Sequence, residues 1–193
     1  MKLSFIVALL LLGFSAFAQE KTLPVDEAGI YTFLEVKELK LVSKETMAAN
    51  VKRFFKENSK SLKLQKSEKD TVFSGKGKMI IQKAVVGIGH PSGDATYRIS
   101  IALRNGKYRL ILTDFMLTPY ERDRYSNFVP GTVSTPLERS PDKLNRAEWD
   151  ANMAAIMLGC RKVAGKLGAI IGSAVTEAKP EPKKTATVST EKW

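Results

Sequence analysis

The chain has 193 residues, a formal net charge of +11, one cysteine and one histidine. A single cysteine excludes an intramolecular disulfide, and a single histidine leaves too few nitrogen and sulfur ligands for a zinc site, which needs three or four. The length is enough for one domain with a sizeable core and short appendages, and the positive charge favours solubility and anionic partners.

The first 18 residues are typical of a cleavable export signal. Lys2 supplies the basic start, residues 5–14 are apolar, and Ser15, Ala16 and Ala18 are the small residues that precede cleavage. The apolar stretch is shorter than the roughly 20 residues of a spanning helix, so a retained anchor is the weaker alternative. We therefore expect cleavage near Ala18 and a periplasmic or extracellular chain that is not an integral membrane protein.

The mature chain is expected to comprise a polar lead-in (residues 19–29), a single domain (residues 30–175) and a basic, disordered tail (residues 176–193). Alternating residue types predict a first strand over residues 31–37. Ser43 is a typical N-cap, and the apolar spacing after it predicts an amphipathic helix to about residue 58.

Residues 63–115 return to strand patterns. A turn is predicted near residues 68–70, and a Gly-rich loop over residues 87–94. The Asn-Gly pair at residues 105–106 predicts a type I′ hairpin turn, in which Leu103 faces Tyr108 on the apolar side. One face of the sheet is then apolar and the other is basic.

The last third of the chain is predicted to be a long irregular segment followed by a long helix. Residues 117–140 contain several prolines and mixed charges. Ser140 and Pro141 then predict a helix start, with the helix running to about Val175. Cys160 is interpreted as a buried apolar residue rather than a reactive thiol.

Apolar residues of this helix recur at steps of four and three. A two-stranded coiled coil would use only this narrow seam, but further apolar residues widen it, which favours a helix lying on a sheet. The seam consists of Trp149, Met153, Ile156, Cys160, Val163, Leu167 and Ile170, and it is widened by Met157, Ala164 and Ile171.

Three segments occur together in one order: residues 43–58 (SKETMAANVKRFFKEN), 72–79 (VFSGKGKM) and 97–115 (YRISIALRNGKYRLILTDF). They resemble a bacterial family of exported domains of unknown function, common in Bacteroidota, whose fold is like that of the TATA-binding protein (TBP). The resemblance is strongest over residues 30–116. It implies an α+β fold, in which a curved antiparallel sheet carries two helices on one face, and it brings no catalytic residues.

The sequence offers little catalytic chemistry. His90, Ser92 and Asp94 are too close in sequence to adopt the geometry of a catalytic triad. The acidic residues Asp114, Glu121 and Asp123 are the only argument for a hydrolase of envelope polymers, and arginines lie between them. We therefore expect no enzyme activity, no cofactor and no metal site.

The remaining candidate site is the basic side of the predicted sheet. We expect a non-catalytic binding domain whose partner is an anionic envelope component or another exported protein; nucleic acid is not expected after export. The alternative is a structural envelope protein that self-associates through the C-terminal helix. The candidate partner-binding residues are Lys76, Lys78, Arg98, Arg104, Lys107 and Arg109.

Overall fold

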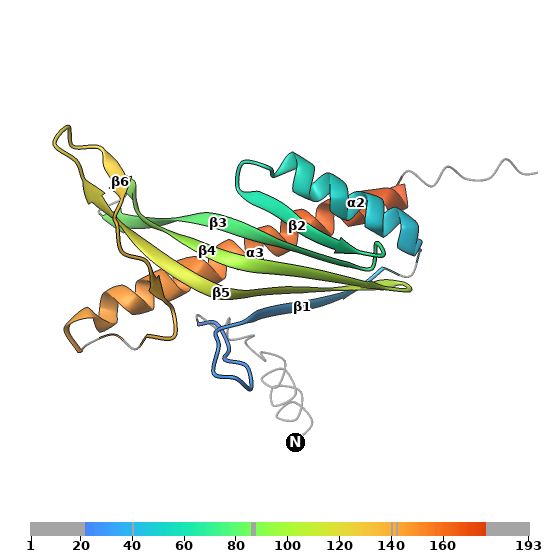
Figure 1. The fold of residues 1–193 in the computed structure, drawn as a ribbon, viewed down its shortest axis with the longest axis horizontal. Helices are drawn as coiled ribbons and strands as arrows, with labels where there is room; N and C mark the ends of the chain where they lie inside the picture. Colours follow the sequence, from blue (N-terminus) through green and yellow to red (C-terminus); the bar gives the residue numbers. More distant parts are fainter. Residues whose placement is uncertain (1–21, 40, 86–87, 140, 142, 177–193) are drawn as a thin grey trace, which may run out of the picture.

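The computed structural model describes residues 22–39, 41–85, 88–139, 141 and 143–176. The expected signal peptide, all but Thr176 of the basic tail, and the expected N-cap Ser140 lie outside the described residues. Figure 1 shows a long twisted sheet crossed by one long helix, with a shorter helix beside the C-terminal end of the long one.

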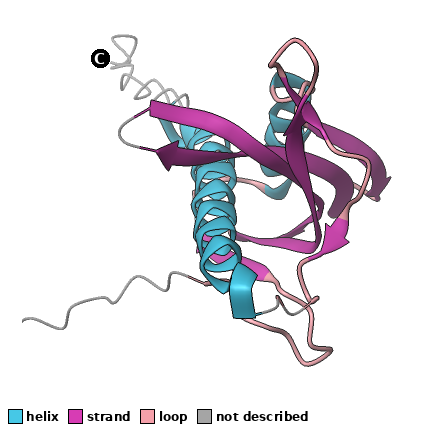
Figure 2. Ribbon diagram, turned by 90° about the vertical axis from the view of Figure 1, so that its left-hand side faces the viewer, coloured by secondary structure: helices cyan, strands magenta, loops and turns pink. Residues whose placement is uncertain are grey.

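The five long strands form an antiparallel sheet in the order β1-β5-β4-β3-β2. Two short strands, β6 (Phe128–Pro130) and β7 (Thr135–Pro136), pair with the far part of β5. Helices α2 and α3 pack on one face of the sheet, as the α+β prediction requires (Figure 2). The elements are β1 (Phe33–Glu38), α2 (Lys44–Glu57), β2 (Leu62–Glu68), β3 (Val72–Val85), β4 (Ile88–Arg104), β5 (Lys107–Arg122) and α3 (Arg146–Thr176).

Helix α2 begins at the predicted residue because Ser43 caps it. Ser43 is extended, with φ −66° and ψ 156°, and its hydroxyl oxygen accepts a hydrogen bond from the Thr46 N–H at 3.1 Å. This bond satisfies a donor that the helix itself leaves unpaired. The buried side of α2 carries Met47, Val51, Phe54 and Phe55, at the spacing of one helical face.

The described part of the lead-in packs with the domain. Leu23 is buried in the core, Val25 forms a β-bridge with Tyr31, and the Thr32 N–H donates to the Pro24 carbonyl at 2.9 Å. The packed unit therefore includes residues that precede position 30.

The β4–β5 hairpin has the predicted register, with Leu103 opposite Tyr108. The predicted type I′ turn is wrong, because of its two central residues only Gly106 has a positive φ, of 68°. The Gly106 carbonyl accepts a hydrogen bond from the Leu39 N–H at 2.7 Å. This contact comes from outside the hairpin, and the Asn-Gly pair alone does not reveal it.

The predicted loop over residues 87–94 is wrong as well. Strand β4 begins at Ile88 and pairs with β3 through this stretch. Proline is tolerated at position 91 because pairing with β5 begins only at Gly93, and because Ser92 is an extra residue that shifts the register there.

Residues 117–140 are more regular than predicted. Strand β5 extends to Arg122 because β4 pairs with it as far as Pro119 and β6 pairs with the rest. A tight turn then follows, in which the Asp123 side chain accepts hydrogen bonds from the backbone N–H groups of Tyr125 and Asn127, both at 2.8 Å. The prolines and charges here shape turns and strand ends rather than one long loop.

Helix α3 lies on the sheet, as its wide apolar stripe predicts. It begins later than predicted, at Arg146, because residues 143–145 first form a 3-10 turn. The seam packs into this chain's own core, so self-association through the same seam would have to expose that core. Burial raises the pKa of the Cys160 thiol to about 12, which leaves it protonated. No helix within the described residues is long and apolar enough to cross a bilayer.

The sheet turns one face to the two helices, and no helix of the described residues covers the other, which is called the open face below. On the covered face, aromatic side chains lie against the backbone of β3. A Cβ at Gly75 would meet Phe55 of α2, and a Cβ at Gly77 would overlap the ring of Tyr97. Residues one position along the same strands therefore point to the open face, since side chains alternate along a strand.

Candidate binding surface

The six predicted basic residues all lie on the open face and are exposed. Strand pairing places Lys76 opposite Arg98 across β3 and β4, and Arg104 opposite Lys107 in the hairpin. These six residues form two separate groups, because Arg98 and Arg104 are six residues apart along β4. At the rise per residue of a strand, this separation is roughly 20 Å. One group is Lys76, Lys78 and Arg98 in the middle of the sheet; the other is Arg104, Lys107 and Arg109 at the hairpin end.

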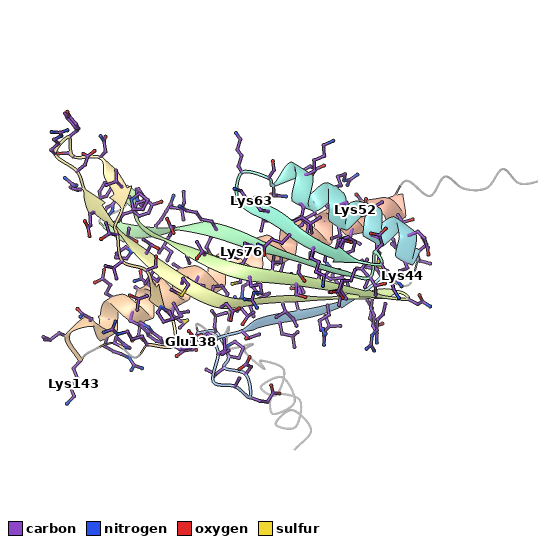
Figure 3. The ribbon with its side chains drawn as sticks, viewed as in Figure 1. Lys44, Lys52, Lys63, Lys76, Glu138 and Lys143 are labelled. Atoms are coloured by element: carbon purple, nitrogen blue, oxygen red, sulfur yellow. The ribbon has the colours of Figure 1, made fainter. Side chains whose placement is uncertain are left out.

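A hollow of about 630 Å³ opens on the sheet beside the first group. Strand β2 adds Lys63, which pairs opposite Lys76 (Figure 3). Lys60 precedes the same strand. Asp114 is the acidic residue in its lining. The five basic residues of the lining, called the basic hollow below, are Lys60, Lys63, Lys76, Lys78 and Arg98.

Lys78 lines the hollow and also forms an ion pair within the fold. Its Nζ lies 2.6 Å from the carboxylate of Asp94, whose side chain is 4% exposed. The hydrogen bond to Asp94 raises the pKa of Lys78 above its ordinary value. Because a buried carboxylate uses this cation, Lys78 contributes less free charge to a ligand than its exposure indicates.

Asp114 sits on the wall of the hollow in a strained conformation. Its φ is 54°, in the left-handed region that disfavours residues with a side chain, and it lies in a bulge where the register between β4 and β5 shifts. Its carboxylate is 3.1 Å from the Arg98 guanidinium. Within the described part of the chain, Lys63 and Lys76 are in no such ion pair. The hollow therefore presents free ammonium groups beside an arginine–carboxylate pair.

Apolar side chains lie between the two basic groups on the open face. Leu34 of β1 pairs with Ile111 of β5, and the same row continues to Ser100 and Ser74 on β4 and β3. Leu34 is 57% exposed. The open face thus combines free positive charge with exposed apolar side chains.

The side chains of His90, Ser92 and Asp94 contact different partners. The His90 ring stacks on Phe128, with ring centroids 5.0 Å apart, and the Ser92 hydroxyl donates to the Ile81 carbonyl at 3.3 Å. No hydrogen bond in the described part of the chain joins the three residues. This geometry does not prepare a proton relay from a carboxylate through histidine to a hydroxyl.

Two of the three acidic residues considered for hydrolysis serve different structures. Asp114 lines the hollow, whereas Asp123 caps the turn after β5. The backbone N–H of Asn127, together with other donors of the turn, holds the pKa of Asp123 below its usual range. Such a carboxyl is poorly suited to donate a proton as a general acid. Among the described residues no group of three or more His, Cys, Asp or Glu could hold a metal ion.

Solved structures share this architecture. A DUF4468 family protein from Bacteroides ovatus aligns with a TM-score of 0.56 over 80% of this chain and 92% of that chain, at 13% identity. A TBP-like protein from Parabacteroides distasonis aligns with a TM-score of 0.55 over 81% of this chain and 98% of that chain, at 12% identity. The chain has a TBP-like fold. The resemblance expected from the sequence is therefore confirmed at the level of the fold. No protein-family model and no curated protein matches the sequence.

The TBP-like fold accounts for the position of the hollow. Both helices cover the same face, and no described helix lies on the opposite face, where the hollow opens (Figure 2). Fold alone assigns no ligand, because one fold hosts many functions. Evidence for a function must therefore come from the residues of the hollow.

Proposed function

We propose that this chain is an exported, non-catalytic binding domain that holds an anionic partner on the open face of its sheet. The observation that carries the proposal is the basic hollow, in which Lys60, Lys63 and Lys76 gather around one concavity without a carboxylate partner of their own in the described part of the chain. Export is supported by the leader pattern of residues 1–18. It would place the hollow among the anionic components of a cell envelope.

The lining indicates the chemistry of the ligand. The volume of the hollow is within the range of sites for small molecules and headgroups, about 300–1,000 Å³. Lysine ammonium groups are compact charges that suit phosphate or carboxylate. The carboxylate of Asp114 beside Arg98 offers a hydrogen-bond acceptor, which favours a ligand with a hydroxyl next to its anionic group. The ligand class is therefore an anionic group on a hydroxylated carrier, either a lipid headgroup or a soluble ester.

The test measures binding of the mature chain to three probes: phosphatidylglycerol vesicles, phosphatidylcholine vesicles and soluble glycerol phosphate. The variant Lys63→Glu/Lys76→Glu reverses two free charges of the hollow. Its matched control, Lys44→Glu/Lys143→Glu, makes the same change of net charge at the far ends of the molecule (Figure 3). Lys78 is left intact because a glutamate there would face the buried Asp94.

We expect the hollow variant to bind the anionic probe at least roughly tenfold more weakly, at about 1 kcal/mol per lysine, and the control variant to bind like wild type. Binding to soluble glycerol phosphate would identify a small ester as the source, and binding to phosphatidylglycerol vesicles alone would identify a lipid surface. Equal loss in both double variants would show that only net charge matters and would contradict the proposal.

A further inference from the structure

Strand β3 is longer than the strand beside it, which leaves part of its edge without a described partner strand. Strand β2 pairs with β3 only as far as Gly77, and the Lys78 N–H donates to the Ser61 carbonyl at 2.9 Å. From there to Val85, β3 has β4 on one side and no other described strand on the opposite side. Lys78 also lines the basic hollow, and the free part of the edge begins beyond it, at Met79.

The backbone of this edge has a defined orientation. Alternate residues of a strand direct their N–H and C=O groups to the same side. Lys78 directs its N–H toward β2, so Ile80 and Gln82 direct theirs to the free edge. Unpaired edge groups of this kind are where an extended peptide can add as a further strand.

A groove of about 500 Å³ runs between this edge and helix α3. The helix contributes Leu158, Lys162 and Lys166, whose spacing of four places them in one line along its side. The sheet contributes Met79 and Ile80, and Leu158 is 54% exposed. Met79 faces the helix, whereas Ile80, one residue along the strand, faces the open side. An added strand would therefore direct alternate side chains toward α3 and the others to the side of Ile80.

The charge of the groove identifies its occupant. Lys78, Lys162 and Lys166 lie in its lining, and no acidic side chain does. A second copy of this chain would bring the same lysines to the contact, so pairing of two identical edges is disfavoured by like charges. We propose that an extended segment of another protein, with alternating apolar and acidic residues, adds to the β3 edge as a strand, with its acidic residues toward Lys162 and Lys166 of α3 and its apolar residues beside Ile80.

The test uses a synthetic peptide of alternating valine and glutamate, and as its control a peptide of alternating valine and lysine. Ile80→Pro removes the outward N–H without removing a bond between β3 and β4, and proline is tolerated on an edge facing solvent. Ile80→Val keeps the N–H and is the matched control. Lys162→Glu/Lys166→Glu reverses charge on α3 and leaves the strand untouched. Urea unfolding of each variant verifies that it folds.

We expect the acidic peptide to bind wild type and Ile80→Val, and to bind Ile80→Pro and the α3 double variant at least roughly tenfold more weakly. Backbone amide exchange of Ile80 and Gln82 should slow when the acidic peptide is bound. Equal binding of the two peptides, or binding unchanged in both Ile80→Pro and the α3 variant, would overturn the proposal. Dimerisation of wild type that Ile80→Pro abolishes would also overturn it, because the occupant would then be a second copy.

Discussion

Replacing Lys78 with methionine removes the cation from a buried carboxylate and keeps a side chain of similar length. In the folded chain the Lys78 Nζ lies 2.6 Å from the carboxylate of Asp94; the Asp94 side chain is 4% exposed and that of Lys78 is 48% exposed. Without the lysine, the carboxylate remains in the sheet with no cation beside it. The variant is therefore expected to have a lower free energy of unfolding.

The size of the loss follows from the exposure of the two partners. Removing one partner of a fully buried ion pair costs about 3–5 kcal/mol. Water reaches about half of the Lys78 side chain, so the cost is reduced by roughly half, to about 2 kcal/mol. For a domain of this size, that lowers the melting temperature by about 4–8 °C.

The effect of this substitution also depends on pH. The hydrogen bond to Asp94 raises the pKa of Lys78 above its ordinary value of 10.5. A lysine with a raised pKa stabilises the fold fully below its ordinary value, and this contribution is lost as the pH rises through the higher folded value. The difference between wild type and Lys78→Met should be constant near neutral pH and should shrink above pH 10.5.

Urea unfolding followed by circular dichroism measures these differences. The matched control is Lys76→Met, on the same strand and the same face but in no described ion pair, and it should change stability by less than about 0.5 kcal/mol. In Lys78→Met/Asp94→Asn the carboxylate is also gone, so the double variant should be more stable than Lys78→Met alone. Equal effects of Lys76→Met and Lys78→Met would refute the role assigned to the pair.

Other substitutions test separate features of the fold. Gly77→Ala should cost about 1–3 kcal/mol in urea unfolding because its Cβ overlaps the buried Tyr97 ring, whereas Gly165→Ala, in open space on α3, should gain up to about 1 kcal/mol. Asp114→Gly should leave stability unchanged or raise it by up to about 1 kcal/mol, since it relieves a φ of 54° and removes only an exposed ion pair. Backbone hydrogen bonds lower the pKa of Asp123 in the folded chain. Asp123 therefore stabilises the β5–β6 turn above the ordinary carboxyl range, and this support is lost as the pH falls through the lower folded pKa. Amide exchange of the turn should accelerate only below that folded pKa, and an unchanged rate would contradict this role of Asp123.

Local patterns predict those parts of the structure that local physics determines. The cap at Ser43 and the apolar spacing after it define α2, and the wide stripe of the last helix correctly predicts a helix lying on a sheet. The register of the β4–β5 hairpin follows from the short turn at residues 105–106, even though the turn type does not.

Features set by pairing between distant residues could not be predicted in the same way. Lys63 reaches the hollow only because the register between β2 and β3 shifts by one residue near Leu64. Without the shift Lys63 would lie opposite Gly77 on the covered face, since a one-residue slip reverses the direction of every side chain. The contact of Lys78 with Asp94 likewise depends on the β3–β4 register, which extends through a segment that glycine and proline mark as a loop.

The proposed function assigns anion binding to the hollow rather than to the basic hairpin end, and this distinction can be measured within one molecule. Both regions are basic and exposed, and each lines a concavity. The hollow beside Lys63, Lys76 and Arg98 has a volume of about 630 Å³. The one beside Arg104 and Lys107, roughly 20 Å away along the sheet, has a volume of about 420 Å³. If only net charge mattered, an anionic ligand would bind equally well at the two regions. A specific site would bind the ligand in the hollow and not at the hairpin end.

The most direct measurement is an NMR titration of residues 19–193 with glycerol phosphate, following the backbone amides of β2 to β5. A specific site in the hollow should give saturable shifts at Lys63, Lys76 and Arg98, absent in Lys63→Glu/Lys76→Glu, with little change at Arg104 and Lys107. Shifts of equal size in both regions, without saturation, would show that the ligand senses only overall charge and would contradict the assignment of the site.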